Sequence, residues 1–318
     1  MNTIPLIFNQ REINRTVLGG KDKMPFVRLN IAVLLLNSEG SHYRGQMLEN
    51  LSKCGFKSIV SFEKTLENYN LDDISHRFPY VKFVVPLEPV TEGDLINIGM
   101  SEVDADYVLV MRDTVSFASD TLTVRLAEKL MEGNPYCVVP RLICPGMPSF
   151  PIVFTPSVRD SMLDVEAVST ISDGVHTLYP FDFIGLYNRQ TFIRLGGYDY
   201  TITSGYWQNL DLSFRAWLWG ERITLSTVFN LSYQEEPPLA DTTANLSSSR
   251  FYLKNLVPEF VDDHGVIPRS AFWVYLRRSS CGFFETLRQF NDARFWVDKN
   301  KYRFRHDAAD IVEQWGNL

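Results

Sequence analysis

Short apolar runs alternate with stretches of helical periodicity over the first third of the chain. Residues 29–36 are apolar except for Asn30, which predicts a strand buried on both faces. Further strands are expected at 57–61, 81–86 and 106–111, and amphipathic helices at 42–54 and 93–103. Strands that alternate with helices in this way form parallel sheets with crossover helices. The pattern therefore predicts an α/β fold with a mostly parallel sheet of nucleotide-binding type.

The pattern becomes less regular after this region. A helix is expected at 121–131, and the Pro-rich segment 135–156 predicts loops and short strands over the carboxyl edge of the sheet. A strand near 181, a helix at 189–195, a Gly-Gly turn and a helix from about 209 to 219 follow. The polar stretch 241–249 is the best linker candidate. We therefore expect an N-terminal extension (1–28), a main domain (29–240) and a linker with a C-terminal helical extension (241–318).

Composition narrows the class of protein. The chain has 318 residues, of which 45% are hydrophobic and 22% charged, as in an ordinary globular protein. The longest apolar runs, 31–36 and 271–276, are far shorter than the roughly 20 residues of a membrane-spanning helix. The N-terminus lacks the pattern of a secretory signal, so a cytoplasmic location is expected. The net charge of −7 argues against nucleic acid as the main partner.

The C-terminal region departs from this acidic average. Residues 269–306 contain nine Lys or Arg and three Asp or Glu, a net charge of +6, and ten of these 38 residues are aromatic. The rings could pack against the main domain or in a dimer contact, which is the simplest interpretation. Alternatively, they could form a peripheral contact with the inner face of an anionic membrane, or stack on single-stranded nucleic acid.

Candidate binding residues follow the predicted strands. Asn37 and Glu39 come after the first strand, Glu63 after the second and Asp113 after the fourth. Ligands of open parallel sheets bind at the carboxyl ends of the strands, so these side chains could receive a nucleotide. Asn97, on the second helix, is either a ligand contact or a buried packing amide.

A second block combines a glycine turn with a helix. It reads Leu195-Gly-Gly-Tyr-Asp199 and then, after a short loop, Trp207-Gln-Asn-Leu-Asp-Leu-Ser-Phe-Arg-Ala-Trp-Leu-Trp-Gly220. The apolar spacing predicts a helix that ends at Gly220. Asp211 and Arg215 are four residues apart on it, so they are expected to pair, or Asp211 to cap the helix start.

With its surroundings, this block resembles the family 2 glycosyltransferases of the GT-A fold. Their pattern is a GG-[FY]-D turn followed by E-D-x-D-L-x-x-R-x-x-x-x-G. The resemblance covers residues 29–235 and includes a first strand that ends in Asn37, the "N-x-G" helix at Asn97 to Gly99, and the strand 106–114, similar to the one that delivers the family's Asp-x-Asp.

The resemblance implies transfer of a sugar from a nucleoside diphosphate donor with inversion at the anomeric carbon. It implies Mg²⁺ or Mn²⁺ on the diphosphate and an Asp as general base, because the leaving diphosphate needs its charge neutralised and the acceptor hydroxyl must lose its proton. Asn37, Glu39, Glu63 and Asn97 would surround the donor, and Asp113 would hold the diphosphate and metal. Gln208 and Asn209 would occupy the positions of the family's catalytic Glu-Asp pair.

The sequence departs from that family in three ways. The Asp-x-Asp position reads Met111-Arg112-Asp113, with one carboxylate, and the strand 224–233 lacks the family's metal-binding His. Both catalytic acids are amides, and an amide has no basic site near neutral pH. Asp211 is the remaining acid of the motif, but it lies about 200° around the helix from residue 209, so it should face elsewhere.

Two functions remain open at this stage. The chain could be an active transferase, of full or weak activity, in the synthesis of a cell-envelope or surface glycan, with a glycan or lipid-linked acceptor. Alternatively, it could be a catalytically degenerate glycosyltransferase-like protein that binds a nucleotide-sugar or glycan as a scaffold subunit. The family favours the first function, and the Gln208-Asn209 pair favours the second.

Overall fold

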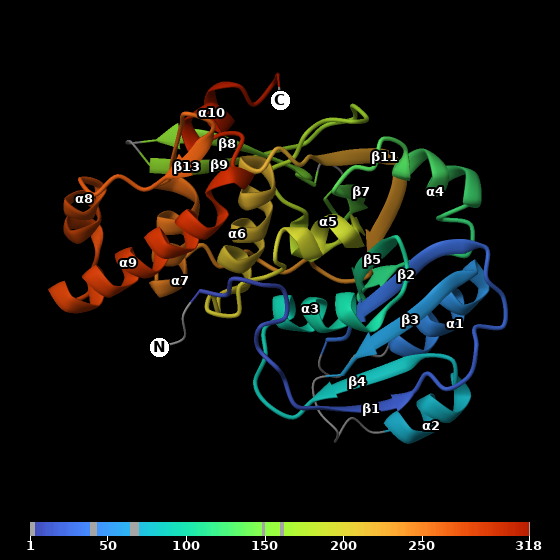
Figure 1. Ribbon diagram of the computed structural model, residues 1–318. Coiled ribbons are helices and arrows are strands. Elements are labelled where there is room, and N and C mark those ends of the chain that lie inside the picture. The colour runs from blue at the N-terminus through green and yellow to red at the C-terminus, as the bar shows by residue number, and fades with distance from the viewer. Residues whose placement is uncertain (1–3, 39–42, 64–69, 148–149, 160–161, 318) are drawn as a thin grey trace.

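The fold is built around one large sheet. The computed structural model describes residues 4–38, 43–63, 70–147, 150–159 and 162–317. In these residues, nine strands form a central sheet with the order β1-β4-β3-β2-β5-β10-β7-β11-β6 (Figure 1). Its strands are β1 (Arg15–Gly19), β2 (Leu29–Leu36), β3 (Phe56–Phe62), β4 (Lys82–Pro86), β5 (Tyr107–Arg112), β6 (Val115–Ser116), β7 (Cys137–Ile143), β10 (Gly185–Asn188) and β11 (Ile223–Tyr233).

The sheet confirms the predicted α/β fold. Strand β2 runs parallel to β3 and β5, β3 runs parallel to β4, and β7 runs parallel to β11. Strands β1, β10 and β6 run antiparallel to their neighbours. The helices α1 (Arg44–Cys54), α2 (Leu71–Arg77) and α3 (Glu92–Glu102) connect the parallel strands of the N-terminal half. The elements predicted in this half are present to within a few residues at each boundary, whereas β1 and α2 were not predicted.

Strand β2 separates the two hydrophobic cores. Ala32 and Leu34 point into one core, whereas Ile31 and Val33 point into the other, as expected for a strand covered on both faces. Helix α3 covers the first of these faces. It can approach closely because Gly99 has no side chain: a Cβ there would lie 2.5 Å from a methyl carbon of Leu34. This close packing fixes α3 against the middle of the sheet.

The second half of the sheet carries the longest buried helix. The elements around this half are α4 (Val124–Met131), η1 (Phe181–Phe183), α5 (Arg189–Arg194) and α6 (Gly205–Leu218). Strands β8 (Val153–Arg159) and β9 (Met162–Val168) form a separate hairpin. Helix α6 begins four residues earlier than expected, because Tyr206 and Trp207 are half-buried and pack on each other and on rings from neighbouring segments. Gly196 and Gly197 form the predicted turn, with φ of 90° and 67°.

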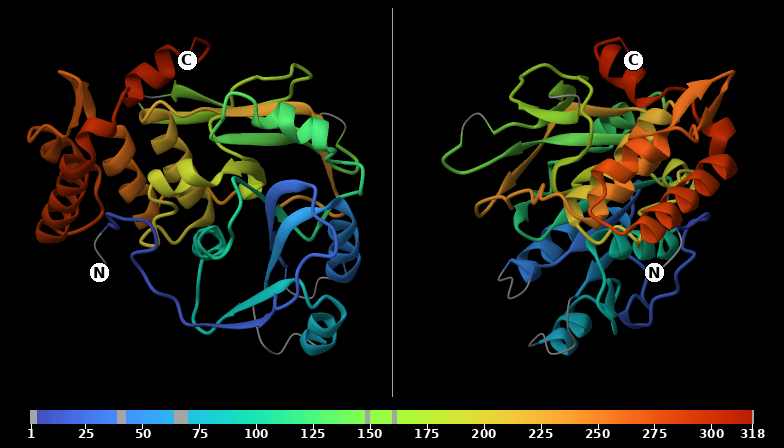
Figure 2. Two further views of the ribbon diagram at one scale, coloured as in Figure 1. Left: turned by 45° about the vertical axis from the view of Figure 1, so that its right-hand side comes forward. Right: turned by 90° about the vertical axis from the view of Figure 1, so that its left-hand side faces the viewer.

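The C-terminal extension packs alongside α6 (Figure 2). It contains α7 (Leu246–Phe251), η2 (Tyr252–Leu256), β12 (Glu259–Val261), β13 (His264–Val266), α8 (Ala271–Arg278), α9 (Phe283–Asn300), η3 (Lys301–Arg303) and α10 (Ala308–Glu313). Trp217 of α6 contacts Trp315, with ring centroids 4.7 Å apart, and Trp219 stacks on Trp296 at 6.1 Å. Part of the stretch expected as a linker, 241–249, is helical, since α7 begins within it. None of the described helices combines the length and hydrophobicity needed to cross a bilayer.

Candidate functional site

A cavity of about 280 Å³ lies where β5, η1 and the first turns of α6 meet. We call it the Asn209 cavity, after the residue that α6 contributes at the position of the family's catalytic acid. Arg112, the last residue of β5, reaches the same cavity. The described residues that line it are Glu92, Arg112, Tyr179, Phe181, Asp182, Phe183, Ser204, Gly205, Tyr206, Asn209, Pro238, Leu239, Ala240 and Asp241.

An ion pair between Arg112 and Asp182 forms one wall of the Asn209 cavity. Arg112 donates to Oδ1 of Asp182 from Nε at 3.0 Å and from Nη2 at 2.7 Å, and the Tyr233 hydroxyl donates to Oδ2 at 3.1 Å. Oε1 of Glu92 lies 3.8 Å from Nη1 of Arg112. We call these four residues the Arg112 cluster. Although burial opposes it, the two carboxylates raise the pKa of Arg112, so the guanidinium stays charged.

The turn that presents Asp182 is strained. Asp182 and Phe183 have φ of 52° and 64°, a left-handed conformation that costs a non-glycine residue about 1–2 kcal/mol. Burial raises the pKa of Asp182, against the lowering effect of Arg112 and Tyr233. Strain of this kind often accompanies functional sites, where the surrounding structure enforces it. Asp182 is therefore a buried carboxylate at a cavity wall, with a pKa raised above its ordinary value.

The two amides of the motif have different surroundings. The side-chain Nδ2 of Asn209 donates to the carbonyl of Pro180 at 2.7 Å, and Asn209 faces the cavity. Gln208 is fully buried: its Oε1 accepts from the backbone N–H of Gly93 at 3.2 Å, and its Nε2 donates to the carbonyl of Asp199 at 3.2 Å. Gln208 thus joins α3 to the loop before α6, and of the pair only Asn209 is placed to meet a ligand.

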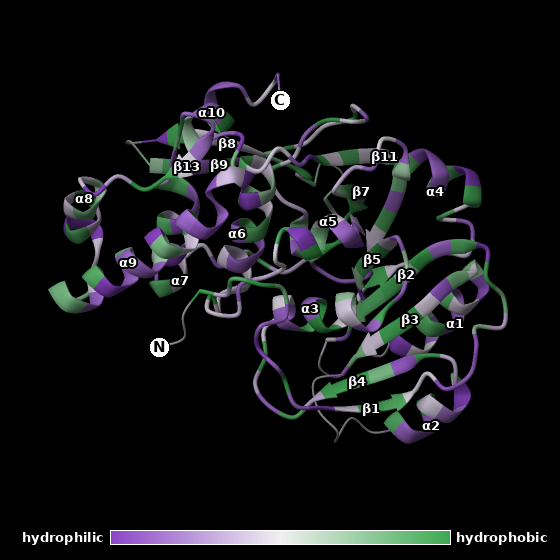
Figure 3. Cartoon of the chain, in the orientation of Figure 1, coloured by the Kyte–Doolittle hydropathy of each residue, from purple (hydrophilic) through white to green (hydrophobic). Residues whose placement is uncertain are grey.

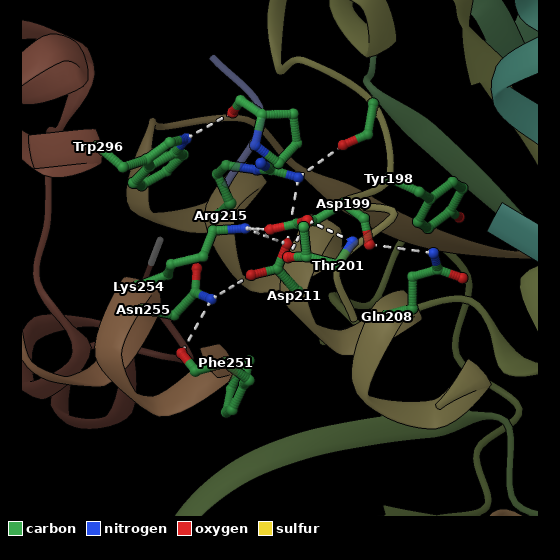
Figure 4. A network of polar contacts seen from close by, with 12 residues as sticks. Tyr198, Asp199, Thr201, Gln208, Asp211, Arg215, Phe251, Lys254, Asn255 and Trp296 are labelled. Carbon is green, nitrogen blue, oxygen red and sulfur yellow. Dashed lines mark hydrogen bonds and ion pairs between the residues drawn. The ribbon is translucent and has the colours of Figure 1, made fainter. Parts of the chain in front are cut away.

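Asp211 belongs to a buried polar network on another side of α6 (Figure 4). Lys254 Nζ lies 2.8 Å from Oδ2 of Asp199 and 2.9 Å from Oδ2 of Asp211, and all three side chains are fully buried. Asn255 donates to Oδ1 of Asp211 at 2.8 Å, and the predicted Asp211 to Arg215 pair is confirmed at 3.4 Å. We call these five residues the Lys254 cluster.

The Lys254 cluster favours the charged form of Asp199. Burial alone would raise the pKa of Asp199, but the Lys254 ammonium and hydrogen bonds from Lys254 and Thr201 lower it below the usual range. Asp211 accepts hydrogen bonds from Lys254 and Asn255. Neither acid is among the described residues that line the Asn209 cavity. As the sequence predicted, Asp211 faces away from residue 209.

The residues predicted at the strand ends do come together. Asn37 Nδ2 donates to Oε1 of Glu63 at 2.8 Å and to Oγ of Ser61 at 2.8 Å, and Arg44 of α1 pairs with the other oxygen of Glu63. All four side chains are buried. The carboxyl ends of β2 and β3 therefore share one polar cluster. Whether it contacts a nucleotide stays a prediction, and Glu39 lies outside the described residues.

Asp113 and Asn97 are also buried. Oδ1 of Asp113 accepts from the backbone N–H of Ser38 at 3.1 Å, which places Asp113 beside the end of β2 and next to the Asn37 cluster. Asn97 pairs with the backbone of Tyr198: Nδ2 donates to its carbonyl at 2.8 Å and Oδ1 accepts from its N–H at 2.9 Å. Asn97 thus holds the Gly-Gly turn against α3, the packing role that the sequence left as one alternative.

The oxygen ligands among the described side chains do not by themselves form a site for Mg²⁺ or Mn²⁺. These cations bind several oxygen ligands, mostly carboxylates and waters. Asp113 already accepts the Ser38 N–H, and Asp182 is held by the guanidinium of Arg112. Among the described side chains, no group of three or more His, Cys, Asp and Glu could hold a metal ion. The role of Asp113 as a metal ligand stays a prediction.

A larger cavity of about 710 Å³ adjoins the first. Tyr206 lines both cavities. The larger one, which we call the C-terminal cavity, lies between the β8–β9 hairpin, α6 and the C-terminal extension. Its aromatic lining comes from Tyr206, Trp207, Phe251 and Tyr252, and Asp164, Arg278 and Glu313 supply its charges. Its volume is typical of small-molecule sites, which are about 300–1,000 Å³.

Sequence reasoning did not find Asp182, Glu92 or Lys254 as parts of these clusters. Arg112 was visible as a basic residue at an acidic position of the motif, and this was the available signal. Asp182 is 70 residues from Arg112 and lies in no motif. Lys254 lies beyond the polar stretch 241–249 that the sequence suggested as a linker.

Comparisons with known proteins show the fold of this chain but do not assign it to a family. No family model matches the sequence, and no curated protein is similar to it in sequence. The fold matches the crystal structure of GalNAc-T7 with UDP, GalNAc and Mn²⁺ over 90% of this chain, with a TM-score of 0.56 and 10% identity. The chain spans 56% of that protein's chain.

Two other solved structures share the architecture more loosely. TarS from S. aureus matches 85% of this chain and 71% of its own, with a TM-score of 0.48 and 12% identity. The mannosyltransferase PcManGT from Pyrobaculum calidifontis, in complex with GDP-Man and Mn²⁺, matches 98% and 80%, with a TM-score of 0.46 and 9% identity. On the match to GalNAc-T7, the fold of this chain is the GT-A fold, as the sequence predicted.

Proposed function

We propose that this chain is a glycosyltransferase that takes a sugar from a nucleoside diphosphate donor and transfers it to a glycan or lipid-linked acceptor in the Asn209 cavity. One observation carries the proposal. Arg112, from the strand that resembles the family's Asp-x-Asp strand, and Asn209, from the helix that resembles its Glu-Asp helix, line the same cavity. The GT-A fold, in which the family's donor and acceptor motifs meet, supports this assignment.

Arg112 is suited to hold the departing diphosphate. The transfer breaks the bond between the anomeric carbon and a phosphate oxygen, so negative charge develops on the leaving group. A guanidinium is always charged and presents planar donors that match phosphate oxygens. Arg112 is 14% exposed and reaches the cavity from the end of β5, so a diphosphate could replace Asp182 as its partner.

Asp182 is the candidate general base. It lines the cavity, and its pKa is raised by burial, as in many carboxylates that bind a proton during catalysis. The acceptor hydroxyl would give its proton to Asp182 while its oxygen bonds to the anomeric carbon from the side opposite the diphosphate. Such a direct displacement inverts the anomeric centre. The amide of Asn209 would orient the acceptor without taking a proton.

The alternative, a binding or scaffold protein without turnover, is favoured by a specific observation. Gln208 and the amide nitrogen of Asn209 are both engaged by the fold, through Gly93 and Pro180. Asp182 is engaged by Arg112 and Tyr233. If the diphosphate does not displace Asp182 from Arg112, the cavity has a ligand site but no available base.

Turnover and binding must be measured together to separate these functions. We expect UDP or GDP to raise the melting temperature, because a ligand selective for the folded state stabilises it by about 2.7 kcal/mol at a hundredfold excess over its dissociation constant. We also expect native protein to release nucleoside diphosphate from a UDP- or GDP-sugar. Binding without release identifies the scaffold function, and no binding by any nucleoside diphosphate contradicts both.

The variant Asn209→Asp sharpens this test. In the native protein the amide nitrogen of Asn209 donates to the Pro180 carbonyl oxygen at 2.7 Å. In the variant a carboxylate oxygen replaces this nitrogen and cannot donate that hydrogen bond. If Asp182 is the base, this variant gains no turnover. A gain of about 10²-fold would instead show that residue 209 is the family's base position and that its amide limits the native rate. Gln289→Glu is a matched control, since it also replaces a buried amide by an acid.

The cellular role is a further part of the proposal. A cytoplasmic enzyme that acts on envelope or surface glycans at the inner face of the membrane fits an acidic main domain followed by the basic stretch 269–306. We also retain the division into 1–28, 29–240 and 241–318. The C-terminal extension contributes Lys254 to the interior and Arg278 to the larger cavity, so it would act as part of the same functional unit.

A further inference from the structure

The aromatic residues of α8 and α9 divide into a buried and an exposed set. Phe272 and Tyr275 of α8 and Phe290 and Trp296 of α9 are buried, which confirms core packing for this part of the tail. Phe295 of α9 is exposed at 54%, apart from a group of exposed apolar residues where α8 and α9 meet. This group consists of Trp273 and Val274 on α8 and Phe283 and Phe284 on α9, with exposed fractions of 61%, 47%, 48% and 85%. We call these last four residues the aromatic corner.

The aromatic corner is continuous. The ring of Phe272 lies 5.4 Å from that of Trp273 and 5.8 Å from that of Phe283, and Phe283 lies 5.7 Å from Phe284. Phe272 itself contacts Phe290 at 5.4 Å and so anchors the corner to the core. Figure 1 shows α8 and the start of α9 at one extremity of the molecule, and Figure 3 shows the first turn of α9 as hydrophobic. The corner therefore protrudes from a rigid base.

Cations surround this corner. Residues 269–288 contain four arginines and one glutamate, a net charge of +3 in a chain whose net charge is −7. Arg269 and Arg277 are exposed. Arg277 is four residues after Trp273, so both lie on the same face of α8. Arg278 lies over the Tyr252 ring at 5.3 Å, and Arg288 pairs with Glu285 at 3.2 Å.

We propose that the aromatic corner is a peripheral membrane contact that inserts Trp273, Val274, Phe283 and Phe284 into the interface of an anionic bilayer. Aromatic rings favour the headgroup region, and each Lys or Arg near an anionic surface contributes about 1 kcal/mol. A second copy of the chain fits this surface less well. A symmetric dimer contact would bring the two +3 surfaces together, whereas an anionic bilayer complements them.

The position of the corner has a consequence for the acceptor. Arg278 borders the corner and also lines the C-terminal cavity, which shares Tyr206 with the Asn209 cavity. A docked molecule would therefore hold the C-terminal cavity, and through it the neighbouring Asn209 cavity, close to the lipid headgroups. That consequence, delivery of a lipid-linked acceptor, rests on the proposed function, but membrane binding does not.

The test is co-sedimentation of the full chain with vesicles. We expect binding to phosphatidylcholine vesicles that contain about 30 mol% phosphatidylglycerol and at least about tenfold weaker binding to phosphatidylcholine alone. The double variant Trp273→Ser/Phe284→Ser should lose at least about tenfold in partitioning. So should Arg269→Glu/Arg277→Glu. The control Ile171→Ser/Val228→Ser, exposed on other surfaces, should bind as native protein does. Equal melting temperatures of the variants exclude unfolding as the cause.

Several results would overturn the proposal. These are no binding to the anionic vesicles, equal binding to both kinds, or full binding by the Trp273→Ser/Phe284→Ser variant. A native dimer that this variant dissociates, without any vesicle binding, would identify a second copy as the occupant. None of these measurements uses a sugar donor, so failure of the proposed function leaves the result interpretable.

Discussion

The Lys254 and Arg112 clusters contain similar groups in different surroundings. Each joins a long cation to carboxylates from distant parts of the chain, beside helix α6. The side chains of Lys254, Asp199 and Asp211 are completely buried, whereas Arg112 and Asp182 are 14% and 6% exposed at a cavity wall. The first cluster has no access for a ligand, so its charges can act only on the fold. The second can exchange its internal partner for a ligand.

The pKa values of Asp199 in the Lys254 cluster and Asp182 in the Arg112 cluster are shifted in opposite directions. Asp199 has a lowered pKa because Lys254 and Thr201 together overcome the effect of burial. Asp182 has a raised pKa because burial outweighs Arg112 and Tyr233. Both carboxylates thus have a cation as a partner, but only the pKa of Asp199 is shifted toward the charged form. The presence of an ion pair is therefore insufficient to assign a role.

The largest expected effect is the loss of the buried cation. Lys254→Met would leave Asp199 buried without its counter-charge and Asp211 with Arg215 alone, and the loss of a buried charge partner costs about 3–5 kcal/mol of unfolding free energy. Chemical denaturation measures it. Lys301→Met, which removes the exposed partner of Asp298, is the control and should leave stability nearly unchanged. A cost below about 1 kcal/mol for Lys254→Met would remove the structural role of this cluster.

The Arg112 cluster should show its largest effect in turnover. Asp182→Asn keeps the shape of the side chain but removes the proposed base, so we expect the rate of sugar transfer to fall at least about 10²-fold, or about 2.7 kcal/mol of barrier. Donor binding should change little. Asp104→Asn, at a fully exposed side chain, is the matched control. Unchanged turnover in the Asp182 variant would exclude it as the base.

A smaller effect is expected on nucleotide binding. Arg112→Met removes the cation that would meet the diphosphate, and charged hydrogen bonds of this kind contribute about 1.5–3 kcal/mol. UDP or GDP should therefore bind more weakly by at least about tenfold in calorimetry. Arg159→Met, at an exposed arginine, should bind as native protein does. If chelation of divalent metal weakens binding more than Arg112→Met does, the family's metal site is present after all.

The smallest expected effect is on the pH dependence of stability. The charged form of Asp199 contributes stability that is present above its unfolded pKa of about 4 and lost as the pH falls through its lower folded pKa. Asp182 has the opposite sign: its raised pKa lets the folded state gain stability as the pH falls toward 4. Asp182→Asn should therefore steepen the loss of stability on acidification. A shallower loss in denaturation curves between about pH 6 and 4 would contradict this assignment.

Local patterns predicted the elements well because their causes are local. The apolar run at 29–36 became β2 with the expected bounds, and the i, i+4 spacing of Asp211 and Arg215 predicted their contact. The start of α6 was misplaced because Gly205 and two aromatic residues are weak helix formers. In that turn, tertiary packing outweighs intrinsic preference.

The two clusters could not be predicted because their causes are not local. The Arg112 to Asp182 pair depends on a left-handed turn at two residues that are not glycine, which no sequence signal indicates. Lys254 reaches Asp199 from 55 residues away, in a segment whose composition resembled a tail. The pattern could therefore single out Asn209, which lines a cavity, but it could not identify the charges around that cavity.

The position of Lys254 in the chain also orders events during synthesis. Asp211 leaves the ribosome 43 residues before Lys254, a delay of several seconds at the roughly 5–20 residues per second of translation. Trp296, whose ring lies 5.0 Å from the Lys254 ammonium and whose Nε1 donates to the carbonyl of Pro5 at 3.1 Å, emerges later still. During this interval Asp199 and Asp211 lack the Lys254 ammonium, and Asp211 has only Arg215 of α6 as a charged partner. The nascent main domain should therefore remain a chaperone substrate until its last helices appear.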